Sequence, residues 1–165
     1  MLVLLQILAV LLVAIAMTLS LAHALELPGK LRLTREAYLA VQPIYYPGFT
    51  IGGVAEPAGL VVLLILLLLT TVGTVEYLLT VSSIVALAAM HATYWLLTHP
   101  VNNFWLDGFE LKGAAASFFS YGAQSPSDAN KADWTELRDR WELSHVIRAI
   151  FGLTSLAALA GAVAL

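Results

Sequence analysis

The chain has 165 residues, of which 60% are hydrophobic and only 12% are charged, and its net charge is −3. Soluble domains average about 45–50% apolar and about 25% charged residues, so this composition indicates an integral membrane protein instead. The absence of cysteine excludes disulfides, iron–sulfur clusters and thiolate zinc sites. The negative charge argues against nucleic acid as a partner, and the length predicts a single transmembrane domain, residues 1–165.

Residues 2–26 form the first expected membrane span, because no charged residue precedes Glu26 and about 20 apolar residues suffice to cross a bilayer. The alternative is a cleaved signal peptide, since Ala22-His23-Ala24 has the small-x-small form of a cleavage site. The stretch lacks a basic amino-terminal region and is longer than a typical signal-peptide core, which favours a retained anchor.

A loop over residues 27–56 comes next, in which Thr34 is expected to cap a short interfacial helix. The second span covers residues 57–75 and begins at Pro57, which suits the first turn of a helix. A tight turn at Gly73–Tyr77 leads to the third span, residues 77–98, which is expected to end at His99-Pro100.

The second long loop covers residues 99–141. Within it, a helix is expected to start near Asp128 and to continue into the fourth span, residues 142–164, which Arg148 interrupts. The predicted fold class is therefore an all-α, four-helix membrane bundle with interfacial helices in its two long loops. We expect spans two and three to offer no carboxylate at the level of the histidines.

The basic residues set the expected orientation. All eight Lys and Arg residues fall in the two long loops or just inside span four, and none falls on the opposite side. The positive-inside rule makes the loop side cytoplasmic, with both termini outside the cytoplasm. We expect the plasma (inner) membrane of a bacterium. Clustered tryptophans on the loop side are typical of an interfacial aromatic belt.

All four histidines of the chain are expected in the cytoplasmic half, where odd spans end and even spans begin. His23 and Glu26, like Glu142 and His145, are three residues apart and share a helix side. Such pairs resemble the ligands of carboxylate-bridged metal sites in helical bundles. His91 can complete a mononuclear site with these residues. The chain is therefore expected to hold either no cofactor or a metal or haem bound by His23, His91 and His145.

A structural role for the same residues remains open. Glu26 and Glu142 can pair with Lys30, Arg138 or Arg148 at the interface. Ionisable groups inside a span are nevertheless costly, at about 2.5–3.5 kcal/mol for a central Arg or Asp on insertion scales, which favours a functional polar site. Arg148 is expected to point into the bundle and to pair with a carboxylate or a ligand oxygen.

Three segments resemble the anthrone-oxygenase-like family of four-span membrane proteins: His23-Ala-Leu-Glu-Leu-Pro-Gly-Lys-Leu, Pro100-Val-Asn-Asn, and Trp134-x-x-Leu-Arg-Asp-Arg-Trp-Glu-x-x-His-x-x-Arg. Many bacterial members have no assigned function, and some fungal members are associated with oxidising anthrones by O₂ without a known prosthetic group. The resemblance implies an oxidoreductase acting on a hydrophobic, aromatic or quinone-like substrate.

In such a site the catalytic candidates are His145, His23 and Arg148. The histidines can act as a base because imidazole titrates near neutral pH, and Arg148 and Asn102 can stabilise an anion. Substrate contacts are expected from Trp141, Trp134, Tyr94 and Asn102. The alternative function is a non-catalytic accessory or assembly subunit of a larger membrane complex, whose partners are other membrane subunits or further copies of this chain.

Overall fold

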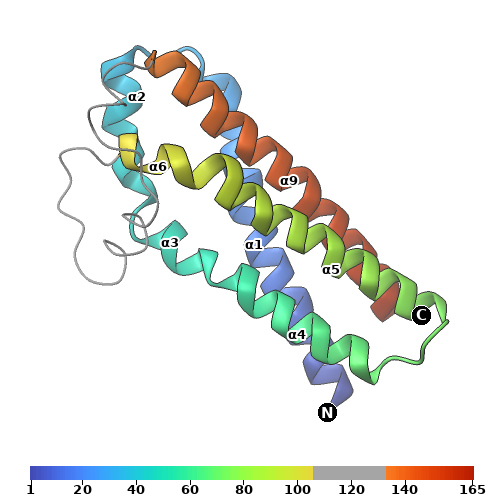
Figure 1. Cartoon of the computed structure of the whole chain (residues 1–165). Coiled ribbons are helices and arrows are strands. Elements are labelled where there is room, and N and C mark those ends of the chain that lie inside the picture. The colour runs from blue at the N-terminus through green and yellow to red at the C-terminus, as the bar shows by residue number, and fades with distance from the viewer. Residues whose placement is uncertain (106–132) are drawn as a thin grey trace.

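The structure is a computed structural model that describes residues 1–105 and 133–165, and no strand occurs among them. Four helices dominate the fold (Figure 1): α1 (Leu2–Lys30), α4 (Ala55–Leu69), α5 (Val75–Thr93) and α9 (Trp134–Ala164). Four helical segments are long and apolar enough to cross a membrane, namely Leu2–Lys30, Gly48–Leu69, Val75–Asn102 and Trp134–Ala164. The all-α four-helix bundle predicted from the sequence is thereby confirmed.

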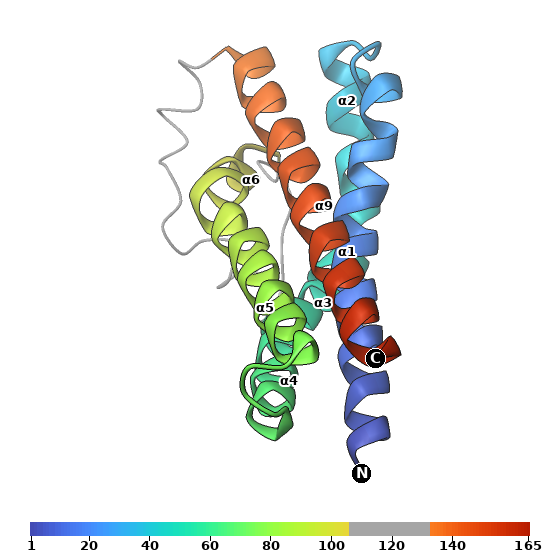
Figure 2. The ribbon, with the colours of Figure 1, turned by 90° about the vertical axis from the view of Figure 1, so that its right-hand side faces the viewer.

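The short elements gather at one end of the bundle. They are α2 (Arg35–Val41), the 3-10 helix η1 (Gln42–Tyr45), α3 (Gly48–Gly53), the π-helical turn η2 (Tyr94–Thr98) and α6 (His99–Trp105). Both chain termini lie at the opposite end, as Figures 1 and 2 agree. α1 and α5 each pack against both α4 and α9. The Thr34 side chain caps α2 by accepting a hydrogen bond from the amide of Ala37, as predicted.

Several predicted boundaries differ from the structure, among them the end of the second span, since α4 ends at Leu69 and not near residue 75. The third span does not end at His99-Pro100, because η2 and α6 continue the helix to Trp105. Pro100 lies inside this continuous helix and lacks the N–H that would bond to the carbonyl of Leu96, which accepts a hydrogen bond of 3.0 Å from Arg140 instead. The fourth long helix begins at Trp134 with Asp133 as its N-cap, whereas the start expected near Asp128 lies outside the described residues.

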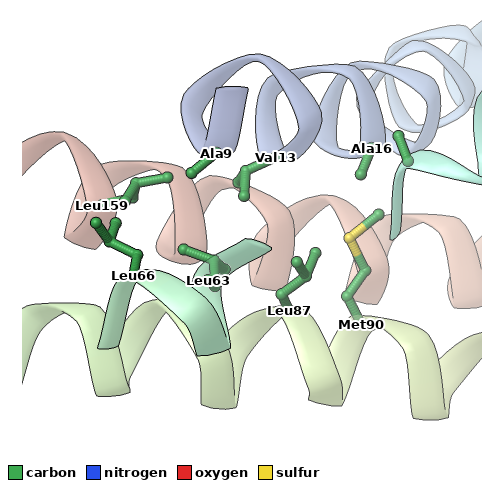
Figure 3. Close-up of a cluster of buried hydrophobic side chains, with 9 residues drawn as sticks. Ala9, Val13, Ala16, Leu63, Leu66, Leu87, Met90 and Leu159 are labelled. Carbon is green, nitrogen blue, oxygen red and sulfur yellow. The ribbon is translucent and has the colours of Figure 1, made fainter. Parts of the chain in front are cut away.

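The core of the half that contains the termini is aliphatic. All four long helices contribute to it (Figure 3), through Ala9, Val13, Ala16, Ala55, Leu63, Leu66, Leu87, Met90 and Leu159. α1 and α9 approach closely here, since a Cβ on Gly152 would lie 3.0 Å from Cα of Met17. Small residues permit such close packing of membrane helices. A hydrogen bond of 2.9 Å between Ser83 and Ser155 joins α5 to α9.

The core of the other half is aromatic. Its buried members are Tyr38, Tyr45, Val101, Trp105 and Trp141. They come from the short elements and from the first turns of α9, so this end of the bundle is built from more elements than the aliphatic end. The candidate polar residues lie in this half.

Candidate functional site

The polar residues lie near one edge of the expected hydrocarbon layer. α1 has 29 residues and is therefore about 43 Å long, whereas the hydrocarbon core of a bilayer is about 30 Å thick. The last turns of α1, which carry His23 and Lys30, thus extend toward the interface. Glu56 in the first turn of α4 is about 20 Å from Leu69 along the helix axis. In a bilayer whose edge is level with Leu69, Glu56 falls inside the hydrocarbon.

The deeper set of polar residues, here called the Glu56 network, joins three helices through one carboxylate. Glu56 is 3% exposed and accepts a hydrogen bond from the guanidinium of Arg148 on α9. Its other oxygen lies 3.1 Å from Nδ1 of His91 on α5. Because Nε2 of His91 accepts a hydrogen bond of 3.0 Å from the Trp95 indole, Nδ1 carries the proton and donates to Glu56.

The Glu56 network confirms one prediction and corrects another. Arg148 is buried and pairs with a carboxylate, as predicted. The expectation that spans two and three offer no carboxylate at this level is wrong, because Glu56, expected at the end of the preceding loop, belongs to α4 and supplies one. The signal that identifies it is Arg148 itself, since a cation within a span requires a partner and Glu56 begins another span of the same bundle.

The second set, here called the Lys30 network, joins α1 to α9 and to the short elements. The ammonium of Lys30 is buried, and it lies 3.2 Å from Nδ1 of His23, 3.1 Å from Glu26 and 3.4 Å from Glu142. α1 and α9 are neighbours, and His23, Glu26, Glu142 and His145 form one cluster, as predicted. Pairing of both carboxylates with Lys30 was one of the alternatives left open by the sequence.

Two tyrosines from the short elements complete the Lys30 network. Tyr38 on α2 donates a hydrogen bond of 2.8 Å to Glu142, and Tyr45 on η1 donates one of 2.6 Å to Glu26. Burial raises the pKa of both phenols, and the adjacent carboxylates raise it further. Both therefore stay protonated and act as donors. Sequence reasoning missed these tyrosines, because nothing in the loop pattern shows that α2 and η1 fold back onto α1 and α9.

His23 and His145 contact each other between the two networks, with ring centroids 4.2 Å apart and ring planes at 61°. Their hydrogen bonds define opposite tautomers. Lys30 can only donate, so Nδ1 of His23 accepts and Nε2 carries the proton. Nδ1 of His145 lies 2.9 Å from the carbonyl of Trp141, which can only accept. His145 therefore presents an unprotonated Nε2, the nitrogen that can act as a base.

Aromatic rings enclose this histidine pair. Ring centroids of Tyr45, Phe49 and Trp141 lie 4.3, 4.8 and 4.8 Å from that of His23, and Trp141 lies 4.2 Å from His145. The pair is thus shielded from water by groups that offer few competing hydrogen bonds.

The predicted substrate-binding residues fall in two places. Trp141 donates a hydrogen bond of 2.9 Å to Asn102, whose amide lies 3.5 Å from the hydroxyl of Tyr94. The ring of Tyr94 lies 5.2 Å from the guanidinium carbon of Arg148, so these residues bridge the two networks. Trp134 lies at the start of α9 instead, beside Arg138.

Of the predicted metal ligands, His91 lies apart from the cluster of His23, Glu26, Glu142 and His145. His91 belongs to the Glu56 network, whereas His23 and His145 contact each other. Within residues 1–105 and 133–165, no three His, Asp or Glu side chains are grouped as metal ligands. Between Glu26 and Glu142 stands the ammonium of Lys30, whose charge disfavours a cation at that point.

A cavity of about 240 Å³ lies at the far end of the bundle, near the termini. Its lining is apolar apart from Gln6, four threonines and Glu76. It contains no histidine, lysine or arginine, and Glu76 is its only charged side chain. The chemistry of the chain is concentrated in the two networks instead, and we take these as the candidate site.

We predict that the effects of replacing Glu56 and Arg148 on stability depend on each other. Removing one partner leaves a buried charge, which costs about 3–5 kcal/mol, whereas replacing both by apolar residues costs far less. Glu56→Met and Arg148→Met should each strongly lower the free energy of unfolding in detergent, and the double variant should recover most of the loss. Ser155→Ala, which removes two neutral hydrogen bonds to Ser83, is the control, at about 1–2 kcal/mol. Additive losses in the double variant would contradict the pairing.

Comparisons with known proteins add no support for the resemblance to the anthrone-oxygenase-like family. No family model matches the chain, and neither a curated protein nor a solved structure matches it. Membership of the anthrone-oxygenase-like family therefore stays a prediction that rests on the three quoted segments. All three segments carry residues of the site, namely His23, Glu26 and Lys30 in the first, Asn102 in the second, and Trp141, Glu142, His145 and Arg148 in the third.

Proposed function

We propose that the chain is a membrane-embedded, oxidoreductase-like protein that acts on a flat hydrophobic substrate of aromatic or quinone-like type. The observation that carries the proposal is the unprotonated Nε2 of His145, held in an aromatic enclosure next to His23. A base in such a place suits an apolar carbon acid, since proton transfer to a positioned imidazole typically contributes about 10²–10⁴-fold to a rate.

Each residue of the site has a separate part in this chemistry. His145 takes a proton from an acidic carbon of the substrate, and the electron pair of the broken C–H bond remains on the substrate as an enolate. Arg148 stabilises the enolate oxygen, because its Nε is buried without a hydrogen-bond partner while its terminal nitrogen pairs with Glu56. Trp141 and Tyr94 contact the faces of the rings, and Asn102 fixes Trp141.

The resemblance supplies O₂ as the oxidant. The enolate carbon gives its electrons to O₂ and forms a C–O bond, and the imidazolium of His145 returns the proton to give a hydroperoxide. Loss of water from the hydroperoxide leaves a carbonyl. One CH₂ group and one O₂ thus become one C=O group and one water, which requires no bound metal or haem.

We predict that His145→Gln folds normally but loses turnover. Gln can still donate to the Trp141 carbonyl, yet it offers no basic nitrogen. O₂ uptake by the purified protein with anthrone should fall by about 10²-fold or more. Ser83→Ala, which alters a buried hydroxyl in the aliphatic half, should keep its activity. If His145→Gln keeps full O₂ uptake, His145 is not the base and this mechanism is wrong.

A second candidate function is that of an accessory or assembly subunit. The supporting observation is that polar side chains form interhelical pairs: Glu56 with Arg148, Lys30 with Glu142, and Thr98 with Ser144. Such pairs fix helices against one another without any catalysis. Purification of the chain in fixed stoichiometry with other membrane subunits favours this candidate, whereas a separable protein that consumes O₂ favours the enzyme.

We further propose that the protein lies in a bacterial plasma membrane with both termini outside the cytoplasm. The support is the placement of the described cations. Lys30, Arg32, Arg35, Arg138 and Arg140 all lie in or beside α2 and the start of α9, at the end opposite the termini (Figure 2). The positive-inside rule assigns this end to the cytoplasm.

The orientation has a direct test. Alkaline phosphatase fused after Leu165 should be active, because it folds only outside the cytoplasm. A fluorescent protein that matures only in the cytoplasm should give no signal when fused at the same position. The same reporters inserted between Arg32 and Arg35 should give the reverse pattern. A fluorescent carboxy-terminal fusion would overturn the orientation.

A further inference from the structure

Two buried polar atoms beside Tyr38 have no hydrogen-bond partner, and they are of opposite kind. Oε2 of Glu142 is an acceptor and Nε2 of Gln42 is a donor. Glu142 and Gln42 are each only 1% exposed. An unsatisfied buried polar group costs about 1–3 kcal/mol, so two of them in one place require an explanation.

The hydroxyl of Tyr38 brings these two atoms together. It donates to Oε1 of Glu142, and Oε2 belongs to the same carboxylate. Gln42 follows Tyr38 by four residues where α2 continues into η1, so the two side chains lie on one side of these helical turns, yet Nε2 of Gln42 makes no hydrogen bond. The free donor and the free acceptor therefore both belong to side chains beside Tyr38.

We propose that Gln42 and Glu142 form a subsite for one hydroxyl group of the substrate, an inference that rests on the proposed function. A hydroxyl oxygen accepts from Nε2 of Gln42 while its hydrogen is donated to Oε2 of Glu142, so a single O–H group satisfies both atoms. A carbonyl satisfies only Gln42, and an ammonium satisfies only Glu142.

The surroundings define the rest of the ligand. Tyr38 belongs to the aromatic core together with Trp105 and Trp141, and the rings of Tyr38 and Trp105 have centroids 5.1 Å apart. The indole nitrogen of Trp105 is a further buried donor without a partner. Aromatic walls beside a hydroxyl-binding pair suit a hydroxyarene, a flat ring system that carries a phenolic O–H. A plain hydrocarbon or a quinone without hydroxyls leaves the pair unsatisfied.

The same pairing of donor and acceptor also fits an internal water, and the two sources make different predictions. A water that serves Gln42 and Glu142 gives no preference between ligands with and without a hydroxyl. A substrate hydroxyl that replaces it gives a preference that depends on Gln42.

The test compares anthraquinone with a monohydroxyanthraquinone whose hydroxyl lies away from the carbonyls. Both are already oxidised, so neither is turned over, and binding can be followed by quenching of tryptophan fluorescence in detergent, with protein-free micelles as the blank. We expect the purified wild-type chain to bind the hydroxy compound about tenfold more tightly, as for one well-placed buried hydrogen-bonding group.

Variants separate this subsite from the base. Gln42→Met keeps the length of the side chain and should reduce the preference to near unity, whereas Ser83→Ala should keep it. His145→Gln should also keep it, since binding needs no base, so loss of turnover and loss of the subsite are observed independently. Equal affinity of the wild type for both ligands, or an unchanged preference in Gln42→Met, overturns the proposal.

Discussion

The ion pair between Glu56 and Arg148 is the constraint on which the rest of the site depends. Neither charge is tolerated alone in hydrocarbon, where a central Arg or Asp costs about 2.5–3.5 kcal/mol on insertion scales. Coulombic attraction is stronger in a medium of low dielectric constant, so the two groups stabilise each other there. The pair fixes α9 against α4, and His91 extends the connection to α5. Since His145 lies one turn before Arg148, the pair also fixes the position of His145 along the bundle axis.

The two halves of the bundle are therefore stabilised by different kinds of interaction. The half near the termini is held by aliphatic packing, and its described interhelical hydrogen bond joins two serines. In the other half, charged groups and aromatic rings replace the aliphatic core, and α2 and η1 fold back over it. Lys30 balances two carboxylates on that side, while Tyr38 and Tyr45 donate to them.

Periodicity and charge were enough to predict the spans and part of the site, but not the contacts that depend on how loops return. Four spans, the clustering of His23 with His145, and the inward Arg148 all result from helix spacing and from the cost of charges in lipid. Glu56 was misplaced because a carboxylate at a span boundary has the same pattern whether it faces water or a buried cation. Tyr38, Tyr45 and Gln42 were missed because the contacts of short interfacial helices are decided by tertiary packing, not by local pattern. Asn102 was predicted near the site, although its hydrogen bond to Trp141 required the continuation of α5 through η2 and α6.

The central claim is that Lys30 and the backbone carbonyl of Trp141 hold His23 and His145 as opposite tautomers, which leaves a basic nitrogen on His145. Nitrogen-15 NMR of labelled histidine distinguishes protonated from unprotonated ring nitrogens, and single His→Gln variants assign the signals. For the protein in lipid at neutral pH, this account predicts that His145 is protonated at Nδ1 only and that His23 is protonated at Nε2 only. A His145 protonated at Nε2, alone or together with Nδ1, would contradict it.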